Sequence, residues 1–167
     1  MRTFTIAHPS PLGDLLISGN DSFISGIRYA DLYPELVEAA VSATEAPALL
    51  RRCALHLDEY FAGWRRTFGL KFQQEGTPFQ QTVWQGLLKI PFGQTNTYGE
   101  LARQIGNTKS SRAVGLANGK NRIAIMIPCH RIIGTSGNLT GYNGGMWRKK
   151  WLLDHEKRIA HGVLSLF

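Results

Sequence analysis

Apolar and polar side chains alternate in short runs over residues 1–30, and turn signals separate the runs. The stretch RTFTIA alternates from its start, GDLLISGN follows a Pro-Leu-Gly turn, and SFISGIRYA follows an Asn-Asp turn. Alternation of this kind is typical of half-buried strands, and short polar turns between such runs favour antiparallel pairing. The pattern predicts a small antiparallel sheet of three strands.

The next apolar residues recur at helical spacing and predict helices over residues 34–45 and 47–62. Pro47 opens the second helix and Gly63 closes it, which are common places for these residues. Cys53 falls inside this helix among leucines. We expect it to be a buried structural cysteine.

The composition changes over residues 69–77, GLKFQQEGT, where polar residues and glycine interrupt the regular period. A stretch of this kind is typical of a boundary between domains. We therefore expect a first domain over residues 1–74 and a second over residues 75–167.

The second half opens with a further predicted helix, in TPFQQTVWQGLLKIPFG. Thr77 suits the N-cap and Pro78 suits the first helical position. The apolar residues that follow share one face and are Phe79, Val83, Leu87 and Ile90.

Two shorter helices are predicted in TNTYGELARQIGNTKSSRAVGLANGKN. The first covers residues 97–104, a turn stands at residues 106–107, and Ser110 or Ser111 caps a second helix that ends near residue 119. This is a helix-turn-helix pattern, although an ordinary helical hairpin fits it as well. The apolar residues that would face each other are Leu101, Ile105 and Val114.

The second of these helices carries many small residues, namely Ala113, Gly115, Ala117 and Gly119. Glycine inside a helix costs about 1 kcal/mol relative to alanine, so its presence needs a reason. Small side chains let another body approach the backbone, which suits a narrow groove or tight packing against another helix. Arg112 stands at the start of this helix, beside the small face.

The composition excludes several classes of protein. The chain has 167 residues, of which 43% are hydrophobic, enough for a packed core. No apolar run approaches the roughly 18 residues that span a bilayer, and we expect no secretory signal. With only Cys53 and Cys129, we expect reduced thiols, a cytoplasmic location, no membrane and no metal.

The charge points to a class of partner. The chain carries 19 Lys and Arg residues against 12 Asp and Glu residues, a formal net charge of +7. A surplus of this size favours a polyanion such as nucleic acid, although a basic protein without such a partner has the same composition.

The segment IPCHRIIG places a thiol and an imidazole side by side. A thiol attacks strongly only as its thiolate, which a neighbouring base or cation helps to form. Residues 123–127 predict a buried strand or extended segment, and in a strand adjacent side chains point to opposite faces. Pro128 lets the backbone leave that strand, so that Cys129 and His130 can cooperate. The alternative is a buried structural cysteine beside a surface histidine.

The last predicted helix, MWRKKWLLDHEKRIA, offers a carboxylate that could orient such a base. Glu156 lies on its apolar stripe and needs a partner, for which a histidine is the natural choice and a lysine at the edge of the stripe is the alternative. We expect Arg148, Lys149 and Lys150 to form a basic surface. Before this helix, GTSGNLTGYNGG holds five glycines and predicts a hairpin and loop.

The stretches TPFQQTVWQGLLKIPFGQTNTYGELA, SSRAVGLANGKN, IPCHRIIG and GYNGGMWRKKWLLDHE closely resemble the O6-alkylguanine-DNA alkyltransferases, the methylated-DNA–protein cysteine methyltransferases. The resemblance is strongest over residues 77–157, and Pro-Cys-His-Arg is its most specific motif. It implies an α+β fold. A ribonuclease H-like N-terminal domain with a small antiparallel three-stranded sheet and helices would precede a mostly helical winged helix-turn-helix domain.

The resemblance also implies a reaction, in which the alkyl group of O6-alkylguanine, and of O4-alkylthymine, moves from DNA to Cys129. His130 would act as the base through a water, and Glu156 would orient it. Tyr98 would donate to the leaving guanine, and Asn121 would tie the recognition helix to the active-site segment. A thioether does not hydrolyse, so each molecule would react once, with no cofactor and no metal.

The implied partner is double-stranded DNA, bound through its minor groove by a monomer that can act cooperatively on DNA. Arg112 would fill the gap that a flipped nucleotide leaves. The other implied DNA contacts are Thr97, Ser111, Ala113, Gly115 and Ala117. The implied pocket for the flipped base is formed by Met126, Arg131, Tyr142, Asn143 and Gly144.

Two other functions fit parts of this pattern. A non-catalytic protein that binds alkyl lesions would need no nucleophile, whereas this chain has Cys129. A cysteine hydrolase would use Cys129 and His130 with repeated turnover, but it would leave the helix-turn-helix unexplained.

The chain departs from the family pattern at three places. Lys-Asn-Arg stands at residues 120–122 where Gly-Asn-Pro is common, which predicts a looser hinge. Leu116 replaces a small residue and changes how closely the helix docks. Asn143 replaces a smaller residue and alters the size of the pocket.

Overall fold

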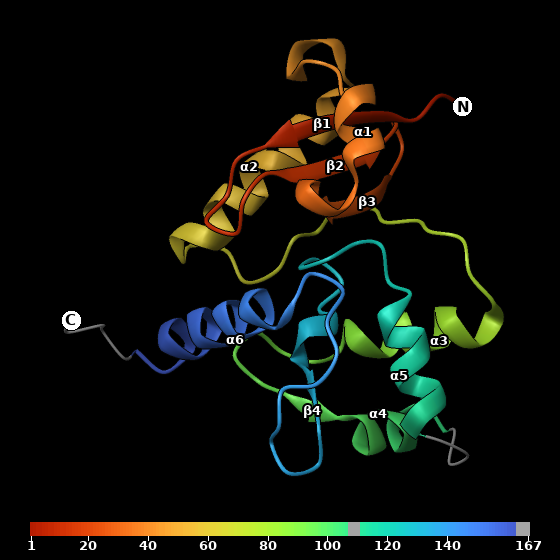
Figure 1. Cartoon of the computed structure of the whole chain (residues 1–167), viewed down its shortest axis with the longest axis vertical. Helices are drawn as coiled ribbons and strands as arrows, with labels where there is room; N and C mark the ends of the chain where they lie inside the picture. The colour runs from red at the N-terminus through yellow and green to blue at the C-terminus, as the bar shows by residue number, and fades with distance from the viewer. Residues whose placement is uncertain (107–110, 163–167) are drawn as a thin grey trace. The chain divides into compact units, whose positions relative to one another are not determined.

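The structure is a computed structural model that describes residues 1–106 and 111–162. The chain divides into two compact units (Figure 1). The first unit holds residues 1–75 together with the later segment 122–126, and the second holds the other described residues. The first unit is therefore discontinuous in sequence.

A three-stranded antiparallel sheet is the core of the first unit, in the order β1 (Phe4–His8), β2 (Leu15–Gly19) and β3 (Ile24–Tyr29). Ile17 in β2 pairs with Ile6 on one side and with Ile27 on the other. Every residue of β2 is buried, as a central strand requires. The predicted antiparallel sheet of three strands is confirmed.

The helical elements of this unit are the 3-10 turn Ala30–Leu32, α1 (Pro34–Ala39), the 3-10 turn Ala43–Glu45 and α2 (Ala48–Ala62). The single helix predicted over residues 34–45 is wrong. The chain becomes extended at Ala40, because the Val41 N–H donates to the Thr5 carbonyl of β1 at 2.9 Å. Cys53 is fully buried in α2 as predicted, with its Sγ 3.8 Å from Met126 Sδ.

The free edge of β3 is extended by residues that follow α2. The Ile24 N–H donates to the Lys71 carbonyl, and the Gln73 N–H donates to the Ile24 carbonyl, both at 2.9 Å. Part of the stretch expected to be a boundary is therefore paired to the sheet.

The same edge also receives the segment 122–126. The Ile27 N–H donates to the Arg122 carbonyl at 2.9 Å, and the Ala124 N–H donates to the Ile27 carbonyl at 3.1 Å. Residues 123–127 are buried as predicted, but they form neither a strand nor a continuous extended segment. Pairing is limited to a single bridge at Ile123, after which the chain turns, and Ile125 adopts a φ of 71°.

The second unit is mostly helical and contains α3 (Pro78–Leu87), β4 (Asn96–Thr97), α4 (Tyr98–Gln104), α5 (Ser111–Gly119), the 3-10 turn Cys129–Arg131, β5 (Ile132–Ile133) and α6 (Met146–Ala160). Thr77 caps α3 and Thr97 caps α4, each in a capping box. The parallel pair β4–β5 and the helices α4 and α5 form the winged helix-turn-helix. Asn107 and Ser110, expected in the turn and at the start of α5, lie outside the described residues.

Close helix contacts hold this unit together. Trp84 Nε1 in α3 donates to the Ala117 carbonyl in α5 at 2.9 Å. Gly86 lets α4 approach α3, since a Cβ there would lie 2.9 Å from side-chain carbons of Leu101 and Ile105. Four apolar residues after Thr77 were predicted to share one face. Phe79 is half-buried, and the other three, Val83, Leu87 and Ile90, are buried. Within the described residues, no helix combines the length and the apolar character needed to cross a membrane.

Candidate active site

The backbone turns sharply at Pro128, and the next three residues form the 3-10 turn Cys129–Arg131. The Arg131 N–H donates to the Pro128 carbonyl at 3.0 Å and closes the turn. Cys129 is 7% exposed and His130 is 0% exposed. The histidine is therefore not a surface residue, and the thiol and the imidazole share one buried turn.

Glu156 in α6 binds both residues that follow the cysteine. Its Oε2 lies 2.7 Å from His130 Nε2, while Arg131 donates from Nε to Oε1 at 2.8 Å and from Nη2 to Oε2 at 3.0 Å. The Gly93 N–H adds a longer bond to Oε1, at 3.3 Å. The partners of Glu156 are therefore a histidine and an arginine, and the lysine alternative is wrong.

Burial and charge set the protonation of this pair. Burial favours the neutral acid at Glu156, but the imidazole of His130 and the guanidinium of Arg131 outweigh it and hold the pKa of Glu156 below its ordinary value. Burial lowers the pKa of His130, and the attraction of Glu156 offsets only part of that effect. The resting pair is a carboxylate and a neutral imidazole.

This pairing also fixes the tautomer of His130. A neutral imidazole bound to a carboxylate must donate from the bonded nitrogen, so Nε2 carries the hydrogen. Nδ1 is then the acceptor, and it is buried with no hydrogen-bond partner among the residues that the structure describes. His130 is thus arranged to accept a proton at Nδ1.

Lys149 is a functional candidate that the sequence analysis missed. It was expected on a basic surface with Arg148, but Lys149 is 0% exposed and Arg148 is also buried. Lys149 Nζ donates to the carbonyls of Ile132 at 2.5 Å and Thr140 at 2.7 Å. Burial lowers the pKa of Lys149 to about 8. The sequence did contain an indication that Lys149 is buried, because Lys149 precedes Glu156 by seven residues and so lies on the same stripe of α6.

The thiol has its own electrostatic environment. Burial raises the pKa of Cys129, so the resting group is a thiol. A side-chain hydrogen bond from Asn121 and the positive charge of Lys149 act in the opposite direction. Both groups therefore favour the thiolate form of Cys129.

Two asparagines connect the end of α5 to the active-site turn. Asn121 Nδ2 donates to the Ile127 carbonyl at 2.9 Å, and Asn118 Nδ2 donates to the Cys129 carbonyl at 3.3 Å. The sequence analysis singled out Asn121 but not Asn118. The latter carried a weak signal, as a polar residue on the inner side of α5.

Two hydrogen bonds hold Arg122, the residue after Asn121. The Arg122 N–H donates to Gln74 Oε1 at 2.9 Å, and the Arg122 guanidinium donates to the Glu75 carbonyl. A proline at this position could make neither bond, and the looser hinge stays a prediction.

The outer face of α5 carries some of the predicted DNA contacts. Ser111 and Arg112 are exposed, and Ala113 and Gly115 are half-buried. Ala117, by contrast, is 3% exposed and its carbonyl accepts from the indole of Trp84, so it faces the core of the unit. The structure does not bring Ala117 to the outer face.

Tyr98 stands beside this face. Its Oη lies 3.0 Å from Thr140 Oγ1, and a Cβ added to Gly115 would lie 3.4 Å from its ring. A shallow groove of about 390 Å³ is lined by Tyr98, Ser111, Arg112, Gly115, Leu116, Thr140 and Gly141. Thr97, at the cap of α4, accepts from the Glu100 N–H at 3.1 Å and so has a local structural role.

The predicted pocket residues divide into separate groups. Tyr142 is half-buried, Gly144 is buried, and the exposed Asn143 donates to the Gly119 carbonyl. Arg131 is held by Glu156 and by the Ile90 carbonyl at 2.8 Å, which makes it a support for the turn. Met126 belongs to the first unit, where its sulfur meets Cys53.

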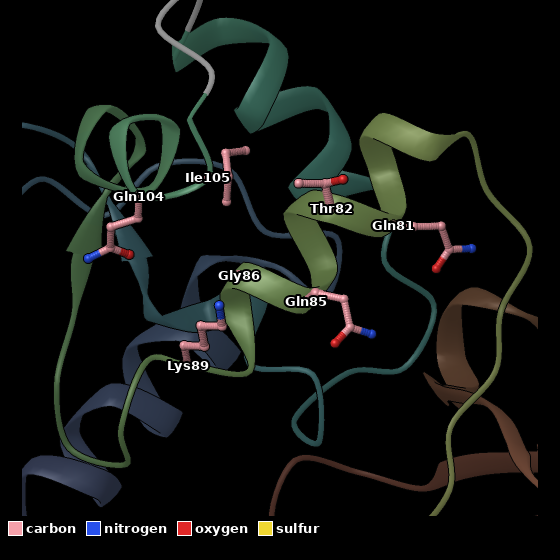
Figure 2. Close-up of a pocket in the computed structure, with 7 residues that line it drawn as sticks. All are labelled: Gln81, Thr82, Gln85, Gly86, Lys89, Gln104 and Ile105. Atoms are coloured by element: carbon pink, nitrogen blue, oxygen red, sulfur yellow. The ribbon is translucent and has the colours of Figure 1, made fainter.

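A second hollow, of about 430 Å³, lies along α3 and α4 (Figure 2). Its polar lining is formed mainly by side-chain amides and the Lys89 amine, and it contains none of the predicted site residues. The described residues also contain no group of three or more His, Cys, Asp or Glu side chains placed to hold a metal ion.

Comparison with known protein families gives two matches. Residues 4–74 match the model of the ribonuclease-like domain of 6-O-methylguanine DNA methyltransferase, and residues 78–158 match the model of the DNA-binding domain of the same enzyme.

Individual relatives agree with these matches. A methylated-DNA–protein-cysteine methyltransferase from Mycobacterium bovis is 46% identical over 158 residues, which is 95% of this chain and 94% of the relative. One from Methanosarcina acetivorans is 45% identical over 149 residues, covering 88% and 94%. A crystal structure of Mycobacterium tuberculosis OGT in complex with DNA superposes with a TM-score of 0.82 at 43% identity, covering 95% of this chain and 94% of the other.

Proposed function

Because the chain belongs to the 6-O-methylguanine DNA methyltransferase family, we propose that Cys129 accepts the alkyl group when this protein repairs O6-alkylguanine in DNA. The protein is a methylated-DNA–protein-cysteine methyltransferase that repairs DNA directly, and DNA is its partner. The observation that carries the assignment of Cys129 is its position in one buried turn with His130, whose imidazole is bound to Glu156.

The geometry supports a specific sequence of steps. His130 Nδ1 takes the proton of the thiol, through a water, and the thiolate is stabilised by Asn121 and Lys149. The sulfur then attacks the alkyl carbon, the carbon–oxygen bond to guanine breaks, and its electron pair stays on the guanine. Tyr98 donates a hydrogen bond to this leaving group. The proton that His130 took from the thiol passes through water to the guanine, which leaves neutral and unmodified while His130 returns to its neutral form. The product is a thioether at Cys129, which no water can cleave, so each molecule acts once.

The DNA-binding part of the proposal rests on α5. A base must leave the duplex before its O6 substituent can reach a buried thiol. Arg112 is exposed at the start of α5 and fills the space of the extruded nucleotide, while the small residues Ala113 and Gly115 let the helix enter the minor groove. The minor groove carries little sequence information, so binding depends mainly on phosphate contacts and on the positive charge.

We assign DNA binding and alkyl transfer to residues 75–167 and a structural role to residues 1–74, which segment 122–126 joins in the first unit. O4-alkylthymine is a second substrate. We place the protein in the cytoplasm, because a free thiol at Cys129 needs a reducing compartment. We further propose that it is a monomer that can bind DNA cooperatively.

The test is the intact mass of the protein after incubation with duplex DNA that carries one O6-methylguanine. We expect a mass gain of one methylene on the peptide that contains Cys129, restored guanine in the DNA, and a reaction that stops at one equivalent. Cys129→Ala should abolish the gain, and Cys53→Ala is the matched control that should retain it. An unmodified wild-type protein that still prefers the lesion would indicate a lesion-binding protein, and repeated turnover would indicate a hydrolase.

A further inference from the structure

One apolar side chain on the outer face of α5 has no role in the site described above. Leu116 is 68% exposed, although leucine is usually buried. It lines the same shallow groove as Tyr98 and Arg112. Because Leu116 is exposed in the free protein, its side chain is removed from water only when a partner covers this face of α5.

The position of Leu116 on the helix defines what it can reach. Val114, Ala117 and Asn118 are the buried residues of α5, so they mark its inner face. Arg112, Gly115 and Leu116 are spaced by three and four residues and share the opposite face. Leu116 therefore projects about 6 Å further along the helix axis than Arg112, roughly the height of two base steps.

The surroundings favour a nucleic-acid partner for this side chain over a protein partner. The groove is bordered by the guanidinium of Arg112, and the second unit that carries it matches a DNA-binding domain model. Proteins that bind the minor groove often insert an apolar side chain such as leucine between base steps and partly unstack them. Gly115, next to Leu116, adds no side chain of its own to this face, where the Tyr98 ring lies against it.

We propose that Leu116 is an apolar wedge that enters the minor groove beside Arg112 and makes the rate of repair depend on the bases next to the lesion. The proposal rests on the proposed function. Insertion is cheapest at pyrimidine–purine steps, which unstack easily, and most costly in stiff A-tracts. The wedge lowers the cost of base extrusion by unstacking the neighbouring step, so repair is fastest where that step is flexible.

The experiment compares single-turnover alkyl transfer rates at subsaturating substrate for the wild type, Leu116→Ala and Leu55→Ala. Leu55 is a matched control, because it is 57% exposed on a helix of the first unit. The substrates are the same O6-alkylguanine as a free base, in a duplex with flexible flanking steps, and in a duplex with A-tract flanks. Only the duplex substrates require the minor-groove contact.

We expect the wild type and Leu55→Ala to repair the flexible duplex several-fold faster than the A-tract duplex. Leu116→Ala should lose this difference, react about tenfold more slowly with the flexible duplex, and retain the wild-type rate with the free base. The free-base rate also reports that the variant is folded. If Leu116→Ala matches or exceeds the wild type on both duplexes, the wedge is overturned and the proposed function stands. If the wild type takes an alkyl group from none of the substrates, the proposed function fails and the wedge fails with it.

Discussion

Glu156 Oε2 lies 2.7 Å from His130 Nε2, and both side chains are almost completely shielded from solvent, with 1% and 0% exposed. Because the Glu156 carboxylate can only accept a hydrogen bond, the neutral imidazole holds its hydrogen on Nε2 and not on Nδ1. It also carries a negative charge that would be very costly to bury without His130 and Arg131. The pair therefore links the stability of the second unit to the basicity of the group beside Cys129.

Replacing Glu156 with glutamine should lower both the stability of the second unit and the basicity of His130. The amide cannot accept from His130 and from both Arg131 nitrogens, so we expect a loss of about 3–5 kcal/mol in the free energy of unfolding. The alkyl transfer rate should also fall, by up to about 10²–10⁴-fold, the range for losing general-base catalysis, because His130 loses the carboxylate that fixes its tautomer and raises its basicity. Urea unfolding and single-turnover transfer measure the two effects. Asp154→Asn is the control, because Asp154 forms an exposed ion pair with Lys150 at 2.6 Å, and the substitution should change stability by about 1 kcal/mol or less.

The pH dependence of stability should follow from the same pair. The pKa of Glu156 is lowered by folding, so its contribution is complete above its ordinary value of 4.5 and is lost as the pH falls below that value. The pKa of His130 is also lowered from 6.5, so acidification below 6.5 protonates the unfolded state first and destabilises the fold.

Thermal unfolding of the wild type and of His130→Asn between pH 8 and pH 4 tests this sign. The wild-type melting temperature should fall below pH 6.5 and fall again below pH 4.5. The first decrease should be smaller in His130→Asn. A wild-type melting temperature that rises on acidification through pH 6.5 would contradict the assignment of a neutral resting imidazole.

Lys149→Met should raise the pKa of the Cys129 thiol, because the methionine has a similar length but no charge. We expect alkyl transfer at pH 7 to fall by about tenfold, which corresponds to a shift of about one pKa unit. The deficit should shrink above pH 8, where the Lys149 side chain of the wild type loses its own charge. A pH profile of the transfer rate measures this, and exposed Lys150→Met is the matched control, which should follow the wild-type profile.

Arg122→Pro should weaken the fold by removing two hydrogen bonds. The proline removes both the N–H bound to Gln74 and the guanidinium bound to Glu75, whereas Arg122→Ala removes only the guanidinium. We expect a loss of about 1–3 kcal/mol for proline and about half of that for alanine. Equal stabilities of the two variants in urea unfolding would show that the N–H contact contributes nothing.

The sequence predicted best those features that depend on near neighbours. The strand pairing of β1, β2 and β3 follows from alternation and short turns, and the helix caps at Thr77 and Thr97 depend on residues three positions away. The resemblance to a family brought Cys129, His130 and Glu156 together, and the burial of these residues agrees with a common site.

The failures involve partners that are distant in sequence. The helix expected over residues 34–45 ends early because Val41 bonds to Thr5, and the strand expected over residues 123–127 is interrupted after its contact with Ile27. Lys149 was placed on the surface because lysine is rarely buried. Its position on the same stripe of α6 as Glu156 could have indicated burial. The carbonyls that accept from Lys149 belong to Ile132 and Thr140, however, and no periodic pattern connects these residues to Lys149.

The pairing of segment 122–126 with β3 has a consequence for synthesis on the ribosome. Residues 1–75 emerge first, but the edge of β3 at Ile27 has to wait for Arg122 and Ala124. Those residues arrive only after α3, α4 and α5 have been translated. The first unit is thus completed by the chain that leads directly to Cys129, so a nascent protein cannot finish this unit before the stretch next to Cys129 has been made. A fragment cut after residue 75 should leave that strand edge open and be prone to aggregation.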